Sequence, residues 1–440
     1  MAYLVGVLIL VVVLLASIAL HELGHMVPAK AFGVRVNQYM VGFGPTLWSR
    51  TRGETEYGIK GIPLGGYVRL AGMYPPAAAV GDPPADGGWA VRLAADAREA
   101  SAEEVPAGEE ERAFYRLSTP KKITVMLGGP VMNLVIAAVL LAVAYVGIGI
   151  PGPTTTVQAV SACVPAAGAA ATQACTAADQ PGPGAVAGVQ AGDRIVSFGG
   201  TAITSWDQLT TLIRAAGGHT VPMVVERAGR QVTLQVTPAV TQRPVLDANG
   251  IPVTGANGQA LTEQAGFLGV TATEATQRAS LLSIPGLVAN RTWATIKVVA
   301  TLPVQAYQVL HETLTGQPRG SSSIVGIVGV GRFAGDIASA QGAGINWGLK
   351  AAGLLEMLAA LNLSLFVFNL IPLPPLDGGH VAAALWEGLK RQAARVRRLP
   401  KPRVADTARL VPLAYTVFAI LGVLGVMLIW ADIVNPVSIG

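Results

Sequence analysis

Two histidines and a glutamate near the N-terminus are the residues with the clearest chemical meaning in this sequence. His21 and His25 are four residues apart, so on a helix they share one face, where two imidazoles can bind one zinc ion. Glu22 between them is free to act as a general base on water. The triplet ends an apolar run that begins at Tyr3. Ionisable side chains in or beside a membrane span are costly and usually functional.

This pair is one ligand short, because a catalytic zinc site usually has three protein ligands and a water. We expect the third ligand to be Asp377, which follows three prolines that break any regular helix and precedes two glycines that permit close backbone approach. His380 is predicted to have a local structural role or to support a ligand, or alternatively to be a fourth donor that would close the site as in structural zinc. His219 and His311 are predicted to be surface residues.

Composition indicates a polytopic membrane protein. The chain has 440 residues, of which 51% are hydrophobic and only 13% are charged. A net charge of +5 is small for this length and does not indicate a nucleic-acid partner. Cys163 and Cys175 lack zinc-finger spacing. They form a disulfide if their side of the membrane is oxidising, and otherwise remain two free thiols.

Four apolar segments are long enough to cross a bilayer. The first lacks the basic region and small-residue cleavage site of a signal peptide, so we interpret it as a retained helix. A weaker apolar segment in 276–345 carries two central cations, which predicts an amphipathic surface helix and a linker. The four predicted spans are residues 1–26, 121–150, 346–380 and 408–433.

Basic residues predict the orientation of these spans. The loop 381–407 between the last two is rich in Lys and Arg, which places it in the cytoplasm by the positive-inside rule. Four spans then put both termini and the region between the second and third spans outside the cytoplasm, and the loop 27–120 inside. The histidine pair and Asp377 consequently lie toward the cytoplasmic side.

The predicted cytoplasmic loop has two parts. Residues 34–72 contain short extended segments separated by glycine-rich turns, which predicts a membrane-associated β-hairpin region. Residues 75–112 are rich in Pro, Ala, Gly and Glu and offer little to bury, so we expect a disordered acidic tract.

The outer region 155–275, which begins with an Ala/Pro-rich segment, is predicted to contain a small α+β domain. Ser205 begins a capping box for a helix, and residues 221–237 alternate as in a hairpin. Together with the turn at 192–195, these elements resemble a circularly permuted, bacterial PDZ domain. Such a domain binds an extended segment or a free C-terminus as an added strand. A domain that only blocks access sterically is the alternative.

The histidine pair with Glu22, the aspartate followed by glycine at Asp377, and the PDZ-like insertion between spans together resemble the site-2 protease family of intramembrane zinc metalloproteases. The resemblance is to the bacterial type that cuts membrane-anchored anti-sigma factors, and it covers nearly the whole chain. It implies one zinc ion held by His21, His25 and Asp377, with Glu22 as base and proton shuttle. The tract 75–112 is not required by the family pattern.

The resemblance also implies substrate-binding residues. Asn369 matches a family asparagine that holds the substrate backbone. Asn133 belongs to a family motif at 128–133, and its alternative role is a hydrogen bond between helices. The hairpin region is implied to pair with an unwound substrate, or alternatively only to pack on the spans. The hairpin residues predicted to bind substrate are Tyr57, Ile59, Gly66 and Tyr67.

By the same resemblance, the fold is a four-span α-helical membrane protein with a cytoplasmic β-hairpin region and an extracytoplasmic PDZ domain, in the lipid bilayer of the bacterial inner membrane. The implied partner is a single-span protein, an anti-sigma factor already cut by a site-1 protease, whose new C-terminus is a ligand for the PDZ domain. Two alternatives are a membrane-anchored peptidase with a soluble catalytic domain and a non-catalytic membrane PDZ scaffold.

Overall fold

The computed structural model divides the chain into two compact units, Met1–Gly149 with Arg278–Gly440, and Ile150–Gln277. The structure describes residues 1–81, 87–164, 175, 179–245, 261–320, 323–341, 346–400 and 402–437.

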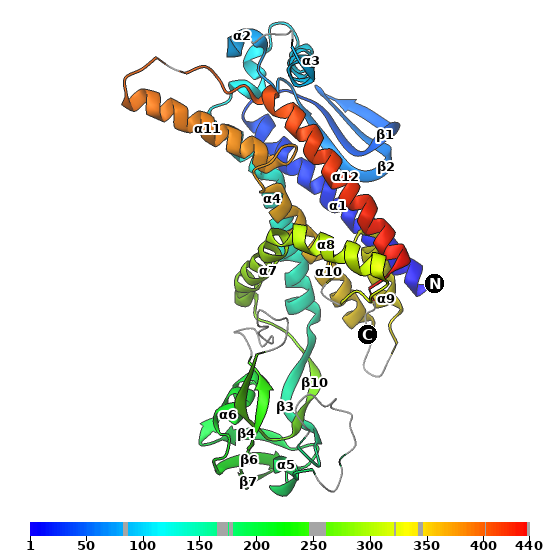
Figure 1. Ribbon diagram of the computed structural model, residues 1–440, viewed down its shortest axis with the longest axis vertical. Coiled ribbons are helices and arrows are strands. Elements are labelled where there is room, and N and C mark those ends of the chain that lie inside the picture. The colour runs from blue at the N-terminus through cyan, green and yellow to red at the C-terminus, as the bar shows by residue number, and fades with distance from the viewer. Residues whose placement is uncertain are drawn as a thin grey trace. The chain divides into compact units, whose positions relative to one another are not determined.

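Within the described residues, four helices of the first unit are long and apolar enough to cross a membrane (Figure 1). Helix α4 packs against both α1 and α10. A Cβ built on Gly24 of α1 would lie 2.3 Å from the carbonyl oxygen of Gly128 in α4, so only glycine permits this approach. The helices are α1 (Ala2–Ala31), α4 (Thr119–Ala142, continued by a π-helical turn to Ile148), α10 (Trp347–Asn369) and α12 (Val411–Val434).

The prediction of one surface helix and a linker in 276–345 is wrong. The structure has three helices there, α7 (Ile284–Ala300), α8 (Leu302–Thr315) and α9 (Ile327–Ser339). Proline at the second position of α8 fits a new helix start better than the interior of a single long helix. The last of them packs on α1, where small residues allow contact: a Cβ on Gly6 would lie 2.3 Å from the Ala334 carbonyl oxygen.

The region after the third span also differs from the prediction. Helix α10 ends at Asn369, and the expected span to residue 380 is interrupted by the prolines. A separate helix, α11 (Asp377–Val396), occupies much of the expected loop 381–407. It is amphipathic and buries Glu387, which forms a 2.9 Å ion pair with Lys122 of α4. This buried pair fixes α11, and therefore its first residue, against α4.

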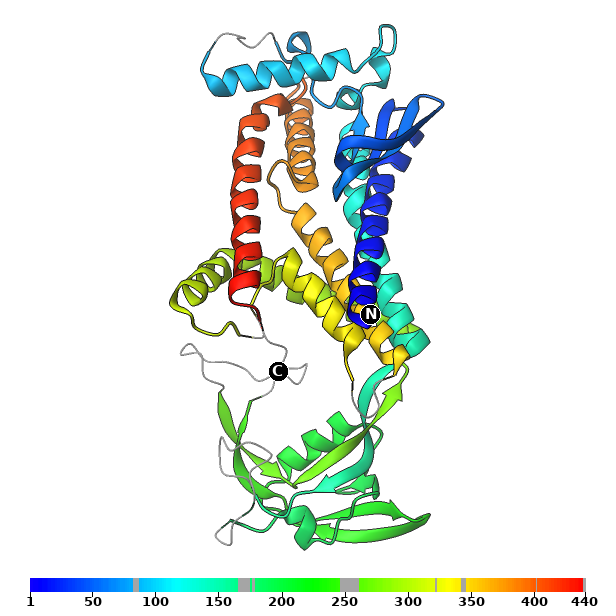
Figure 2. The same ribbon diagram turned by 90° about the vertical axis from the view of Figure 1, so that its right-hand side faces the viewer.

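Most of the tract 75–112 is ordered, contrary to the prediction of disorder. It contains α2 (Ala77–Val80) and α3 (Trp89–Glu103), which lies across the beginning of α12 (Figure 2). Helix α3 buries Ala94, Arg98 and Ser101, a spacing of four and three residues that defines one face. Composition concealed this face because two of its three residues are polar.

Two bent strands form the sheet of the predicted hairpin region, β1 (Val36–Arg52) and β2 (Thr55–Leu70). Residues 36–41 pair with 56–59 on one side and with 66–70 on the other, while 48–52 pair with the far side of 55–59. Residues 55–59 are therefore internal. Among the described residues, 66–70 pair on one side only, so this segment, named the edge strand below, has a free edge.

The second unit has the α+β character expected from its sequence. Strands β10, β3, β4, β6 and β7 form a sheet in that order, and β5 pairs with β4. Helix α6 (Trp206–Ala215) is capped by Ser205, whose Oγ accepts a 3.2 Å hydrogen bond from the Gln208 amide. The strands of this unit are β3 (Ile150–Val160), β4 (Arg194–Phe198), β5 (Thr201–Ala202), β6 (Val221–Arg227), β7 (Arg230–Val236), β8 (Ala239–Pro244), β9 (Thr262–Phe267) and β10 (Val270–Gln277). A short helix, α5 (Pro183–Val186), precedes β4.

Cys163 and Cys175 form a disulfide bond in this unit. Of the two alternatives that the sequence left open, the structure therefore has the oxidised pair. The hydrophobic core beneath the sheet is built from residues of β4, α6 and β6, including Ile195, Leu209 and Met223.

Asp193 provides a test of the stability of the second unit. Its side chain is 1% exposed and accepts hydrogen bonds from Nε and Nη2 of Arg227 at 2.7 and 2.8 Å. We expect Asp193→Ala to lower the free energy of unfolding by about 2 kcal/mol, as for other hydrogen bonds between charged groups. Hydrogen exchange in β4 and β6 would become faster. Glu226→Ala, which removes an exposed ion pair with Arg194, is the control and should change little.

The same pair predicts acid sensitivity. The hydrogen bonds from Arg227 hold the pKa of Asp193 below its ordinary value. Because aspartate in an unfolded chain titrates near about pH 4, the stabilisation is fully present above that pH and is lost as the pH falls through the lower pKa of the folded state. Acidification should lower the protection factors of the β4 and β6 amides, which compare exchange with the intrinsic rate at the same pH, more in the wild type than in Asp193→Ala. An equal fall in both proteins would contradict this assignment.

Candidate active site

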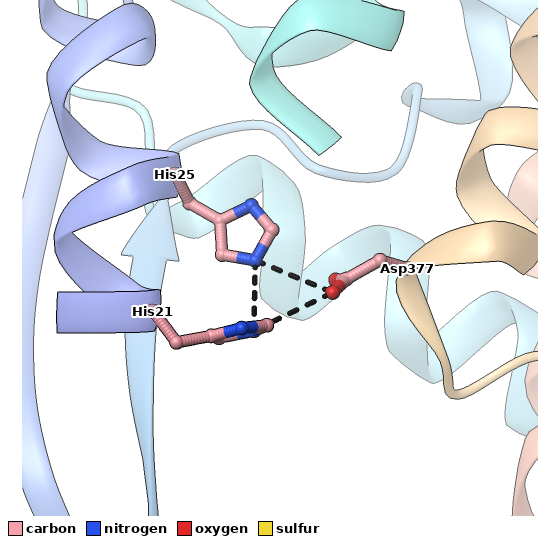
Figure 3. A group of neighbouring side chains, drawn as sticks. All are labelled: His21, His25 and Asp377. Carbon is pink, nitrogen blue, oxygen red and sulfur yellow. Dashed lines mark hydrogen bonds and ion pairs between the residues drawn. The ribbon is translucent and has the colours of Figure 1, made fainter. Parts of the chain in front are cut away.

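The three predicted zinc ligands meet in space (Figure 3). His21 and His25 project from one face of α1, and Asp377 reaches them from the first turn of α11. The Nε2 atoms of the two imidazoles are 3.2 Å apart, and they lie 3.5 and 3.4 Å from Oδ2 of Asp377. Three potential donor atoms thus surround one point although their residues are separated by some 350 positions in the sequence.

The donor set fits a zinc ion. Nδ1 of His25 lies 2.8 Å from the carbonyl oxygen of Val125, to which it donates, so in the neutral ring Nε2 carries the free lone pair. Within the described part of the chain, Oδ2 of Asp377 is buried and has no hydrogen-bond partner. Two imidazole nitrogens and a carboxylate oxygen are ligands that zinc prefers.

Asn133 lies behind His21 in the structure. Its side-chain amide is 3.1 Å from Nδ1 of His21, and its Oδ1 is buried without a partner. The two ends of an amide are interchangeable in such an assignment. With the amide turned over, Oδ1 accepts a hydrogen bond from Nδ1 of His21, both atoms are satisfied, and Nε2 of His21 is free for a metal. This geometry matches the alternative of a hydrogen bond between helices, here between α4 and α1.

A cavity of about 560 Å³ contains the site. The edge strand enters it close to Glu22: a Cβ built on Gly66 would lie 3.1 Å from Cγ of Glu22 and 2.9 Å from the Met40 carbonyl oxygen. Glycine at position 66 therefore lets the strand pass beside Glu22. The predicted site residues that line this cavity are His21, Glu22, His25, Gly66, Tyr67, Asn369 and Asp377.

Three predicted substrate-binding residues do not line this cavity: Asn133, which lies behind His21, and Tyr57 and Ile59 of the hairpin. Tyr57 and Ile59 belong to the internal segment of β2, whose edges are both paired, and the Tyr57 hydroxyl accepts a 3.0 Å hydrogen bond from Nζ of Lys30. The bend of the hairpin places these residues between the segments 36–41 and 48–52 of β1. No local sequence signal predicts this arrangement of the segments.

The other histidines separate clearly. His380 lines the cavity but is not one of the three residues whose donor atoms lie within 4.8 Å of one another. His219 and His311 are exposed, as predicted.

The cavity also has a wall that the sequence analysis did not predict. This wall consists of Ala97, Ala100 and Ser101 of α3 and of Glu104, which directly follows the helix. The sequence signal for this wall was the spacing of small residues within the tract expected to be disordered.

Comparison with known proteins agrees with this chemistry. The model of peptidase family M50 matches residues 9–415. The zinc metalloprotease Rip1 of Mycobacterium tuberculosis is 33% identical over the whole of both chains, and that of Mycolicibacterium smegmatis is 32% identical over 99% of this chain and 98% of its own. The metalloprotease MmpA of Caulobacter vibrioides is 29% identical over 89% of each chain. The chain therefore belongs to peptidase family M50, the site-2 proteases, and is a zinc-dependent metalloprotease of that type.

Proposed function

We propose that this protein cleaves the transmembrane segment of a single-span membrane protein already shortened outside the cytoplasm, an anti-sigma factor, and releases a cytoplasmic fragment. The observation that carries the proposal is the position of the donor group. His21 and His25 lie within an apolar helix long enough to span a membrane, and Asp377 follows a second one closely. A soluble peptidase domain in the loop 27–120 would instead place its third ligand there.

In this proposal His21, His25 and Asp377 hold one zinc ion, which when bound polarises a carbonyl group and lowers the pKa of a water molecule. Glu22 accepts the proton of the attacking water and returns it to the leaving amide nitrogen. Asn133 keeps His21 in the orientation and tautomer that leave Nε2 free.

Substrate binding in this proposal relies on the edge strand. A peptide bond inside a helix is shielded by its own hydrogen bonds, so a substrate helix has to unwind before it is cut. The released backbone then pairs with the free edge at 66–70, as in other strand-addition complexes. Because Gly66 passes directly beside Glu22, such pairing places a substrate peptide bond next to the base. Asn369, the last residue of α10, lines the same cavity and is proposed to hold the substrate backbone.

The orientation is also part of the proposal. The basic residues of 381–407 favour a cytoplasmic location for α11, which puts the site toward the cytoplasm and both termini and the second unit outside, in the bacterial inner membrane. The disulfide Cys163–Cys175 supports an oxidising location for that unit. The PDZ-like unit there either excludes large ectodomains or binds the new C-terminus of a trimmed substrate.

Replacing the proposed base tests the chemistry. We expect Glu22→Gln to lower the cleavage rate of a single-span model substrate in proteoliposomes by about 100-fold or more, because a positioned acid–base group contributes that much. Zinc content, measured by mass spectrometry of the purified protein, should not change. His311→Gln, at an exposed position, is the control. Cleavage by Glu22→Gln at the wild-type rate would overturn the assignment.

Zinc titrations with a competing chelator test the ligands. Loss of a residue that only supports a ligand typically weakens metal binding by about 10–100-fold, which we expect for Asn133→Ala. Loss of a ligand in Asp377→Asn should weaken it further. His380→Asn should bind zinc like the wild type. If it loses zinc as Asp377→Asn does, His380 is a fourth ligand.

Adding a methyl group at position 66 tests whether the close approach of the edge strand to Glu22 matters for cleavage. Gly66→Ala has no room beside Glu22 and should move the strand away, lowering cleavage by about ten-fold, in line with the cost of overpacking. Gly61→Ala, also in β2 but outside the edge strand, is a matched control, since its Cβ would make ordinary contact at 3.5 Å with Pro45. Equal activity of the two variants would argue against substrate pairing at 66–70.

A further inference from the structure

We propose that helix α3 is the second wall of the substrate cleft and that it admits only small side chains of the substrate on the side that faces it. The inference rests on the proposed function and adds a specificity determinant to it. The tract that carries α3 is the one that the family resemblance does not require, so its role needs a separate explanation.

The wall is made by one face of α3. Ala97, Ala100, Ser101 and Glu104 line the cavity and are spaced by three, one and three residues, as on a single helical face. Three of the four are small. The same cavity is lined by the edge strand and by the three potential zinc ligands. A substrate segment paired with the edge strand beside Glu22 therefore lies in the cavity that α3 also lines.

Helix α3 is firmly anchored. Arg98 donates hydrogen bonds from Nε and Nη2 to the two carboxylate oxygens of Asp406 at 3.2 and 2.7 Å. The side chains are only 7% and 12% exposed, so this bidentate pair is largely desolvated. Ser101 Oγ also accepts a hydrogen bond from the Tyr74 amide and donates one to its carbonyl oxygen. Displacing the helix would break these contacts.

The C-terminal end of α3 also contacts the hairpin. Glu104, which directly follows α3, forms a 3.4 Å ion pair with Arg69 of the edge strand, and the Glu104 carbonyl oxygen accepts a 3.0 Å hydrogen bond from the side chain of Asn37 in β1. A wall held by these contacts restricts the size of the side chains that pass in front of it. In an extended segment, alternate side chains point to the same side. The substrate class is therefore a membrane segment with Gly, Ala or Ser at alternate positions beside the cleaved bond.

Leucine substitutions in α3 test this proposal. We expect Ala97→Leu and Ala100→Leu to lower cleavage of a small-residue model substrate by about ten-fold or more, through KM, with zinc content unchanged. Ala100→Gly should increase cleavage of a substrate that carries leucine, in place of a small residue, at the alternate positions beside the cleaved bond. Ala102→Leu, at an exposed position of the same helix that does not line the cavity, is the matched control and should behave like the wild type.

A second measurement does not depend on the activity of the variants. In the Glu22→Gln background, a photo-crosslinking amino acid at position 100 should capture the substrate, and one at 102 should not. If both leucine variants match Ala102→Leu while the wild type cleaves the substrate, the role of α3 is wrong and the proposed function stands. If the wild type, loaded with zinc, cleaves no single-span segment, both proposals fail.

Discussion

The contact between the carboxylate of Asp377 and the two imidazoles of α1 is the interaction on which the rest of the first unit depends. The side chains of His21, His25 and Asp377 are only 14%, 8% and 19% exposed, and a carboxylate is costly to bury without partners. Contacts from neighbouring helices position these side chains. The glycine contact between α1 and α4 brings Val125 and Asn133 to the histidines, and the Lys122–Glu387 pair fixes the helix that begins at Asp377. The site is thus a property of three helices packed together.

The interruption of the chain between α10 and α11, and the glycine at position 66, also shape the site. The prolines after Asn369 end α10 and allow a new helix to begin at Asp377, so the carboxylate sits in a first helical turn, where a negative charge is favourable. On the other side of the cavity, Gly66 removes the side chain that would separate the edge strand from Glu22. The edge strand therefore passes Glu22 at a residue that has no side chain.

Local patterns in the sequence predict much of this structure. The apolar runs predict four long helices, and the spacing of His21, Glu22 and His25 predicts one face of the first. Asp377 is predictable because the ligand count is incomplete without it. The buried face of α3 is not predictable from local patterns, since it depends on Arg98, whose partner Asp406 is 308 positions away. The exclusion of Tyr57 and Ile59 from the cavity likewise follows from how the hairpin bends, which pairing alone decides.

The long separation between Arg98 and Asp406, and between His21 and Asp377, has a consequence for synthesis. The early members of both pairs leave the ribosome long before the late ones, because a chain grows at about 5–20 residues per second. Neither the donor group nor the anchor of α3 is complete until nearly the whole chain has been made. While the first apolar helices of a nascent chain meet other membrane segments, its group of potential zinc ligands is therefore still incomplete.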